Sequence, residues 1–215
     1  AYAIKEVSKR EASMETALVA AAVGIVATVL FVRRQRTSAA PLVDFSLFRN
    51  RRFSSGVATA LVASAALMGV ELVFSQRLQL VSGFSPLEAG LLILPIPLTS
   101  FVAGPLTGLA LPRLGSERIL SGSLAISGVG LAAYLLCYDA DPAIWLTAMG
   151  VMGFGIGAAM TAASSAIMLS APENRAGMAA SVEEVSYELG GAMGIAILGS
   201  VMSALYSATF VLPTS

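Results

Sequence analysis

Residues Ala143–Ser170 read AIWLTAMGVMGFGIGAAMTAASSAIMLS and contain no charged side chain. A helix rises about 1.5 Å per residue, so about 20 apolar residues cross the hydrocarbon core of a bilayer. Backbone groups in lipid must find partners within their own segment, which favours a helix over an open strand. This stretch therefore predicts a transmembrane helix in a membrane protein.

Five further stretches have the same apolar character, and no alternating pattern typical of a membrane barrel appears among them. The six predicted spans are Thr16–Val32, Ser55–Phe74, Ala89–Leu111, Ile119–Tyr138, Ala143–Ser170 and Gly177–Phe210. The expected fold is therefore all-α, a polytopic bundle of transmembrane helices.

The composition narrows the classes of function. The chain of 215 residues is 56% hydrophobic and 12% charged, with zero formal net charge and a mean hydropathy of +0.81. A neutral chain without a basic, aromatic-rich stretch gives no reason to expect nucleic acid as a partner. Because the chain has no histidine and only Cys137, it cannot assemble an imidazole–thiolate metal site, a Cys/His nucleophile or a disulfide framework. We expect no metal and no cofactor.

Arginine is concentrated in alternate connections between the predicted spans. The connections on the opposite side contain one basic residue, Arg77, and the DADP turn at Asp139–Pro142 contains none. The basic residues of the N-terminal stretch are balanced by glutamates. By the positive-inside rule, the arginine-rich connections face the cytoplasm. Their arginines are Arg33, Arg34, Arg36, Arg49, Arg51, Arg52, Arg113, Arg118 and Arg175.

Prolines and glycines predict where helices bend and where they pack closely. The third span contains Pro95, Pro97 and Pro105, and each proline removes a backbone donor, so a kink or hinge is expected there. The pairs Gly153–Gly157 and Gly190–Gly194, in spans five and six, let helix backbones approach each other. Both simple packing and a sliding interface are compatible with these pairs.

Three carboxylates stand near the start of the sixth span, in ENRAGMAASVEEVSYELGG. Glu183, Glu184 and Glu188 follow the predicted cytoplasmic turn, and no Lys or Arg lies within the span to neutralise them. Charges inside a membrane are costly, so they normally face a cavity or a partner. Such a cluster can exchange protons with water and attract a cationic substrate. The alternative is that Glu183 and Glu184 are solvated at the membrane interface.

Further side chains are candidates for the lining of a cavity near these acids. Thioethers and aromatic rings accommodate varied shapes and cations. Glu71, near the outer end of the second span, has the simpler explanation of pairing with Arg77 or bonding with Gln76. The candidate lining residues are Met68, Glu71, Ser100, Phe101, Met152, Phe154 and Tyr187.

Three motifs together resemble a known family. PLVDFSLFRNRRFSSG precedes the second span, AGLLILPIPLTSFVAGPLTGLALPRLG crosses the third, and ENRAGMAASVEEVSYELGGAMGIAILGS opens the sixth. They resemble the C-terminal half of the fourteen-helix drug:proton antiporters of the major facilitator superfamily, the QacA, SmvA and LfrA type. The resemblance covers nearly the whole chain, and the last motif is the most specific.

The resemblance implies a division of the chain. Residues 1–36 would be an outer segment and the last helix of a central hairpin, 37–54 a cytoplasmic linker, and 55–215 most of the C-terminal transmembrane bundle. The chain also begins at Ala1 in a polar stretch without an initiator methionine. We therefore expect a piece of a longer protein, whose N-terminal half is its partner.

The resemblance also implies roles for individual residues. The EEVSYELG stretch implies that the acids Glu183, Glu184 and Glu188 take part in substrate recognition and proton coupling. Ser100 stands where some relatives have an acid, so that contribution does not carry over. A degenerate cytoplasmic gating loop, in which Pro112 replaces an acid, would consist of Gly108, Arg113, Gly115 and Arg118.

The function implied by the resemblance is proton-coupled export across the bacterial cytoplasmic membrane by alternating access. The substrates would be lipophilic cations, including quaternary ammonium antiseptics and dyes, and the proton gradient would drive their export. Two alternatives remain: a carrier of another metabolite on the same fold, and a membrane scaffold that transports nothing. An acid cluster without basic residues in the membrane favours cationic cargo, and no span carries an enzyme motif such as G-x-S-x-G.

Overall fold

The computed structural model describes residues 14–38 and 43–209. Within these residues six helical segments are long and apolar enough to cross a membrane, which confirms the six predicted spans. The elements in chain order are α2 (Met14–Thr37), the 3₁₀ turn η1 (Phe45–Arg49), α3 (Arg51–Gln76), the π turn η2 (Arg77–Val81), α4 (Pro86–Ile93), α5 (Pro95–Leu114), α6 (Ser116–Cys137), α7 (Pro142–Ser170), the 3₁₀ turn η3 (Glu173–Arg175) and α8 (Ala176–Thr209).

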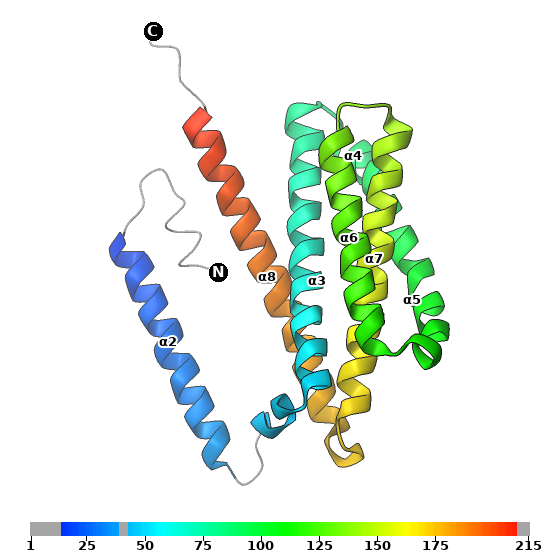
Figure 1. Cartoon of the computed structure of the whole chain (residues 1–215). Helices are drawn as coiled ribbons and strands as arrows, with labels where there is room; N and C mark the ends of the chain where they lie inside the picture. The colour runs from blue at the N-terminus through cyan, green and yellow to red at the C-terminus, as the bar shows by residue number, and fades with distance from the viewer. Residues whose placement is uncertain (1–13, 39–42, 210–215) are drawn as a thin grey trace.

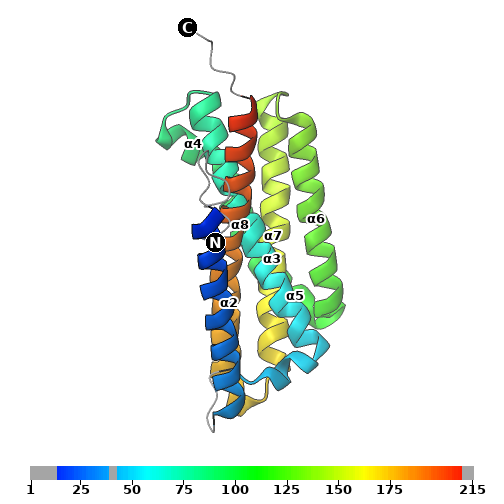
Figure 2. The ribbon, with the colours of Figure 1, turned by 90° about the vertical axis from the view of Figure 1, so that its left-hand side faces the viewer.

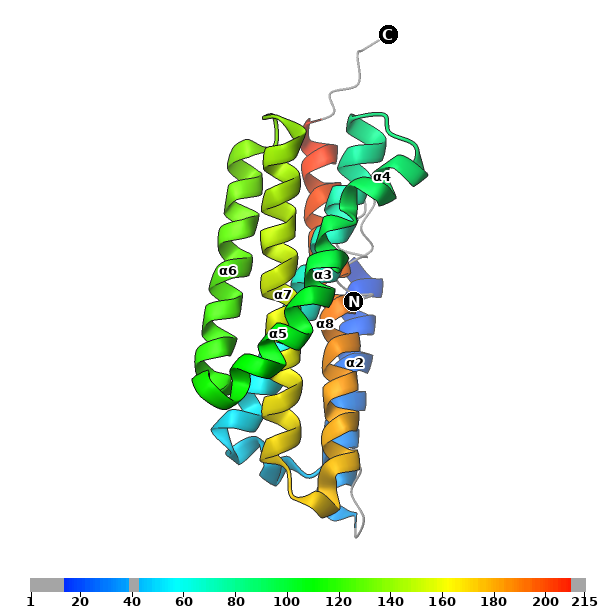
Figure 3. The ribbon, with the colours of Figure 1, turned by 90° about the vertical axis from the view of Figure 1, so that its right-hand side faces the viewer.

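Helix α7 is the centre of the bundle. It packs against α3, α5 and α6, whereas α8 packs mainly along α3 and meets α7 only briefly. The side views show α7 and α8 running along the length of the molecule, with α3 slanting across them in Figure 2 and α5 slanting across α7 in Figure 3. Helix α2 lies beside this bundle and is separated from α8 in Figure 1. The described part of the chain is thus a bundle in which α8 depends on α3 for its position.

The outer surface of the bundle is apolar. Large aliphatic side chains such as Leu109, Leu136 and Leu169 are largely exposed, while α7 contributes more buried residues than any other described helix. Lipid solvates such a surface, whereas water would not. The connections rich in arginine, α2–α3, α5–α6 and α7–α8, lie toward one end of the molecule (Figure 1). We call it the cytoplasmic end, following the arginine rule.

The predicted break in the third span is present at its outer part. Helix α4 ends at Ile93 and α5 begins at Pro95, so the span consists of two helices that meet at Leu94. Pro95 and Pro97 remove two backbone N–H donors within one helical turn at this junction. Pro105, in contrast, lies inside the continuous helix α5 and does not interrupt it.

Glycines bring the helices into backbone contact, as their spacing predicts. A Cβ atom on Gly190 would overlap the backbone of Leu61, and one on Gly194 would overlap that of Ala65. These two glycines seat α8 on α3. Gly153 and Gly157 of α7 are equally close to the backbone of α5. Because backbone atoms cannot rotate aside as side chains do, any larger residue at these positions must separate the helices.

A polar clamp holds the segment before α3 against the start of α8. Arg175 donates hydrogen bonds to the carboxylate of Asp44 and to Ser46 Oγ, and the Asp44 backbone N–H meets Met178 Sδ at 3.0 Å. Hydrogen bonds from the Ser46 backbone N–H and hydroxyl, aided by the charge of Arg175, hold the Asp44 pKa below its usual 3.8. Asp44 is therefore ionised at neutral pH, and the ion pair with Arg175 is present there.

Candidate functional site

The three predicted acids lie on the cytoplasmic half of α8. Glu184 and Glu188 are exposed and one turn apart on the same face of the helix, whereas Glu183 is half-buried. Their local structure is a continuous helix, since no proline lies between Ala176 and Thr209 and alanine, glutamate and leucine are good helix formers. The helix therefore displays the acids at fixed spacing along its axis.

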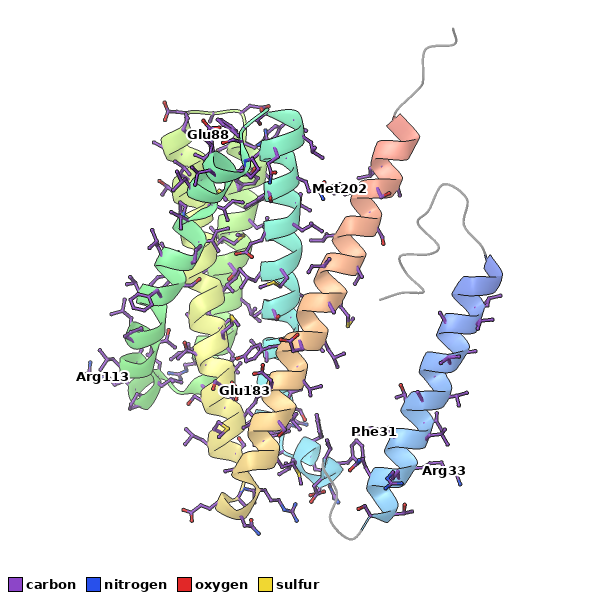
Figure 4. All side chains as sticks on the ribbon, turned by 180° about the vertical axis from the view of Figure 1, so that it is seen from behind. Phe31, Arg33, Glu88, Arg113, Glu183 and Met202 are labelled. Atoms are coloured by element: carbon purple, nitrogen blue, oxygen red, sulfur yellow. The ribbon has the colours of Figure 1, made fainter. Side chains whose placement is uncertain are left out.

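The packing of α8 on α3 fixes the height of these acids in the membrane. Gly190 lies beside Leu61 and Gly194 beside Ala65, so the two helices run in parallel register. Extended toward the cytoplasmic end, this register places Glu183 beside the first turn of α3. In Figure 4 Glu183 lies at about the height of Arg113. Glu188 lies about 7.5 Å deeper along the helix axis.

We call Glu183, Glu184 and Glu188 the acid ladder. It starts on the half of α8 that is nearer the cytoplasmic end of the bundle and continues along the helix through Glu188. None of the three forms an ion pair with another described residue, and neither α7 nor α8 contains Lys or Arg. In the part of the chain that the structure describes, no group of His, Cys, Asp and Glu could hold a metal ion. Among the described residues, no basic side chain is therefore paired with the acid ladder.

Tyr187 stands where α8 meets α3 and α7. Its hydroxyl donates a hydrogen bond to the Met160 carbonyl of α7, at 3.1 Å. Its own carbonyl accepts a hydrogen bond of 2.6 Å from Ser64 Oγ of α3. The tyrosine therefore ties the stretch of α8 that carries the acid ladder to both neighbouring helices.

The structure separates the candidates Ser100, Phe101 and Met152. Ser100 Oγ donates a hydrogen bond of 2.6 Å to the Gly153 carbonyl, which ties α5 to α7. Phe101 is 82% exposed on α5. Met152 is only 2% exposed, because it lies in the core where Gly130 of α6 meets the Met152 backbone. Met152 therefore packs in the core of the described bundle, and its role as a cavity residue stays a prediction.

Phe154 and Met68 are more accessible. Phe154 lines a shallow groove of about 510 Å³ together with Pro95, Thr99 and Gly150, between α5 and α7. Met68 is 37% exposed and lies on α3 beside Gly191 of α8. Phe154 is therefore on the α5 side of α7 and Met68 on the α8 side of α3, so they do not share one site in the described chain.

Glu71 does not make the expected pair with Arg77. Arg77 donates a hydrogen bond to Tyr134 Oη at 3.1 Å, lies 3.5 Å from Asp139, and stacks over the ring of Tyr138. Glu71 is half-buried on α3 and has no ion pair among the described residues. The expectation of pairing is wrong because the α6–α7 turn, distant in sequence, brings Asp139 to Arg77.

The predicted gating loop borders a cavity of about 620 Å³ at the cytoplasmic end. Gly108, Gly115 and Arg118 line it, whereas Arg113 lies in the last turn of α5 outside the lining. Gly115 has a φ of 76°, a left-handed conformation that favours glycine at this sharp turn. Arg52 and Glu117 approach to 3.7 Å across the cavity mouth, but both are about three-quarters exposed, so this pair contributes little to stability.

Sequence reasoning missed the contacts that depend on helix neighbours. The clamp between Asp44 and Arg175 had one local signal, because Asp followed by Phe-Ser is typical of a helical cap, but nothing indicated its partner. No local sequence signal indicated the bond from Tyr187 to Met160 or the contacts of Arg77. These contacts join residues 27 to 131 positions apart in the chain.

Comparison with known proteins is consistent with this architecture. The family model described as Major Facilitator Superfamily matches residues 13–211. The chain is 38% identical over 186 residues to the methyl viologen resistance protein SmvA of Salmonella typhimurium, which covers 86% of the chain and 37% of that protein. It is also 36% identical over 198 residues to the multidrug efflux pump LfrA of Mycolicibacterium smegmatis. This match covers 92% of the chain and 39% of LfrA.

A third relative is the multidrug resistance protein Stp of Mycobacterium tuberculosis, 32% identical over 184 residues, covering 86% of the chain and 34% of Stp. The chain therefore spans between a third and two-fifths of the length of these curated relatives. The family match extends over nearly the whole chain, and the helical bundle fits it. This chain belongs to the major facilitator superfamily and is a multi-pass protein of the bacterial inner membrane.

Proposed function

We propose that this chain is part of a proton-coupled exporter of lipophilic cations, and that the acid ladder of α8 is where protons and cations compete. The observation that carries the proposal is that no Lys or Arg within residues 14–38 and 43–209 forms an ion pair with Glu183, Glu184 or Glu188. A negative site at the cytoplasmic rim that reaches into the membrane suits a cation arriving from the cytoplasm or the inner leaflet.

The relatives support both the direction of transport and the kind of substrate. Their names describe multidrug efflux and resistance to methyl viologen, and methyl viologen is an organic dication. A dication is best matched by two carboxylates at helical spacing, such as Glu184 and Glu188, which share one exposed face.

Competition for charge supplies the coupling. Two opposite unit charges 4 Å apart attract by about 4 kcal/mol at an effective dielectric constant of 20, before desolvation is subtracted. Protonation of a ladder carboxylate removes that attraction, so a bound proton and a bound cation exclude each other. If the acid ladder opens to each side of the membrane in turn, a cation leaves on one side and a proton takes its place. The proton then leaves on the other side, where a new cation binds.

In alternating access one bundle of helices moves against another, so each bundle needs an exposed surface that faces the other. Glu184 and Glu188 are exposed on α8, as are Phe101 and its neighbours on α5. We infer that the remaining part of the transporter covers these faces, with membrane lipid around the outer helices. The close seating of α8 on α3 would let the two helices move as one body.

The experiment uses the full-length protein in liposomes loaded with methyl viologen. An inward-directed gradient is expected to accelerate export by up to about tenfold for each pH unit, since one pH unit corresponds to about 1.4 kcal/mol per proton. A protonophore should abolish the acceleration. Export at the same rate with and without the gradient would rule out proton coupling, and no export of any organic cation would rule out the function.

A further inference from the structure

The cavity of about 620 Å³ at the cytoplasmic end has a charged part and an apolar part. Its charged part is formed by the first turns of α3 and α6, and its walls continue along α5 and α7 toward the middle of the bundle. Gly108, the lining residue farthest along α5, lies about 10 Å from Gly115 along the helix axis. The cavity therefore has room for an elongated ligand with a polar end and an apolar end.

Positive charge exceeds negative charge in this cavity. Arg52 and Arg118 line it together with one acid, Glu117. Arg52 lies 3.7 Å from Glu117, whereas Arg118 forms no ion pair within residues 14–38 and 43–209. Ser116 also lines the cavity, and its hydroxyl can donate a hydrogen bond to an anion. The charged part is therefore suited to a ligand with negative charge.

The apolar part of the cavity includes leucines that face outward from the bundle. Leu114 and Leu169 line the cavity and are 52% and 82% exposed. They belong to helical segments that are long and apolar enough to span a membrane, so acyl chains are the solvent expected around them. A small hydrophilic anion would gain nothing from these leucines. A phospholipid would contact them with a chain while its phosphate meets the arginines.

The position of the arginines in their helices also favours a lipid. The ends of membrane-spanning helices lie at the depth of the lipid headgroups, and the first turns of α3 and α6 are such ends. A guanidinium group presents a planar set of N–H donors that matches the oxygens of a phosphate. Basic pockets between membrane helices on the cytoplasmic side are suited to anionic headgroups for this reason.

We propose that this cavity binds an anionic phospholipid of the cytoplasmic leaflet. Arg118 holds the phosphate, and Arg52 exchanges Glu117 for the same headgroup. Leu114 and Leu169 contact the first part of an acyl chain. The headgroup carries a net negative charge, as that of phosphatidylglycerol does, because a zwitterionic headgroup would bring a further positive charge beside the arginines.

The lipid links two elements that have little direct contact. Helices α3 and α6 each pack against α7 but meet one another only briefly, and in Figure 3 the turn between α5 and α6 lies close to the start of α3. The ion pair Arg52–Glu117 joins them, but both side chains are about three-quarters exposed, so the pair contributes little. A phosphate held by Arg52 and Arg118 would fix the α5–α6 turn against α3.

The test measures lipid binding to the full-length protein in detergent by native mass spectrometry. The probes are phosphatidylglycerol, phosphatidylcholine with the same acyl chains, and soluble glycerol 3-phosphate. One arginine beside an anionic lipid contributes about fivefold in affinity, so phosphatidylglycerol should bind at least about fivefold more tightly than phosphatidylcholine. Glycerol 3-phosphate should not displace it. Equal binding of the two lipids, or displacement by glycerol 3-phosphate, overturns the proposal.

Variants of the lining assign the binding to this cavity. Arg52→Gln and Arg118→Gln should each weaken phosphatidylglycerol binding about fivefold. Glu117→Gln should strengthen it, because the variant removes the carboxylate that competes with the phosphate for Arg52. Such a gain cannot come from a misfolded protein.

Arg113→Gln is the matched control. Arg113 is exposed in the last turn of α5 and lies outside the lining, so its loss should leave lipid binding unchanged. Unchanged binding in both Arg52→Gln and Arg118→Gln, or an equal loss in Arg113→Gln, contradicts the assigned site. The midpoint of thermal unfolding without added lipid checks that each variant is folded. No transport is measured, so the result is independent of the proposed function.

Discussion

Glu184→Gln is expected to reduce proton-driven export of a dication by at least about tenfold while leaving the protein folded in the membrane. Glutamine keeps the size and helix propensity of the side chain but removes its charge and its proton. A carboxylate 4 Å from a cation attracts it by about 4 kcal/mol at an effective dielectric constant of 20, and a net loss of about 1.4 kcal/mol after desolvation already corresponds to a factor of about 10 in affinity. The measurement is the rate of methyl viologen export from liposomes under a fixed proton gradient.

Two matched variants give this result its meaning. Glu173→Gln removes an equally exposed carboxylate from the turn just before α8 and should export at the original rate. Glu188→Gln, deeper on the same face as Glu184, should have a graded effect that depends on the substrate. Unchanged export from both Glu184→Gln and Glu183→Gln would contradict the proposed role of the acid ladder.

Gly194→Leu is expected to destabilise the folded protein by about 1 to 3 kcal/mol. A Cβ atom at this position already overlaps the backbone of Ala65, so the larger side chain must push α8 away from α3. Neither backbone can rotate aside. The expected observations are a lower midpoint of thermal unfolding and a lower yield of monodisperse full-length protein.

Gly128→Leu is the matched control for this substitution. Gly128 lies within α6, and a Cβ atom there would meet no other atom within 4 Å. The same change should alter the free energy of unfolding by no more than about 0.5 kcal/mol, or increase it, since leucine favours helix over glycine. Equal stability of the two variants would show that α8 is not seated on α3 through Gly194.

The sequence was sufficient for the helices because their lengths follow from local apolar runs. The six spans, the break near Pro95 and the close approach at Gly153, Gly157, Gly190 and Gly194 all depend on residues within one helix. Their physical causes are the thickness of the bilayer, the missing proline donor and the absence of a Cβ atom. Each of these signals can be recognised in the sequence of a single helix, before its neighbour is known.

The partners of individual side chains depend on which helices are neighbours, and the sequence does not determine that. Met152 has the composition of a cavity residue but packs against α6, and Arg77 pairs with Asp139 rather than with the nearby Glu71. Tyr187 was expected near the acids, but its bond to Met160 follows only from the height of α7 beside α8. The identity of the site residues was thus easier to predict than their contacts.

The central claim is that protons and cations compete for the acid ladder, and proton release on cation binding tests it most directly. Methyl viologen is added to the weakly buffered full-length protein, and a pH indicator records the protons released. The unchanged protein should release protons, and a variant with Glu183, Glu184 and Glu188 all replaced by glutamine should release none. Equal release from both proteins would contradict the claim.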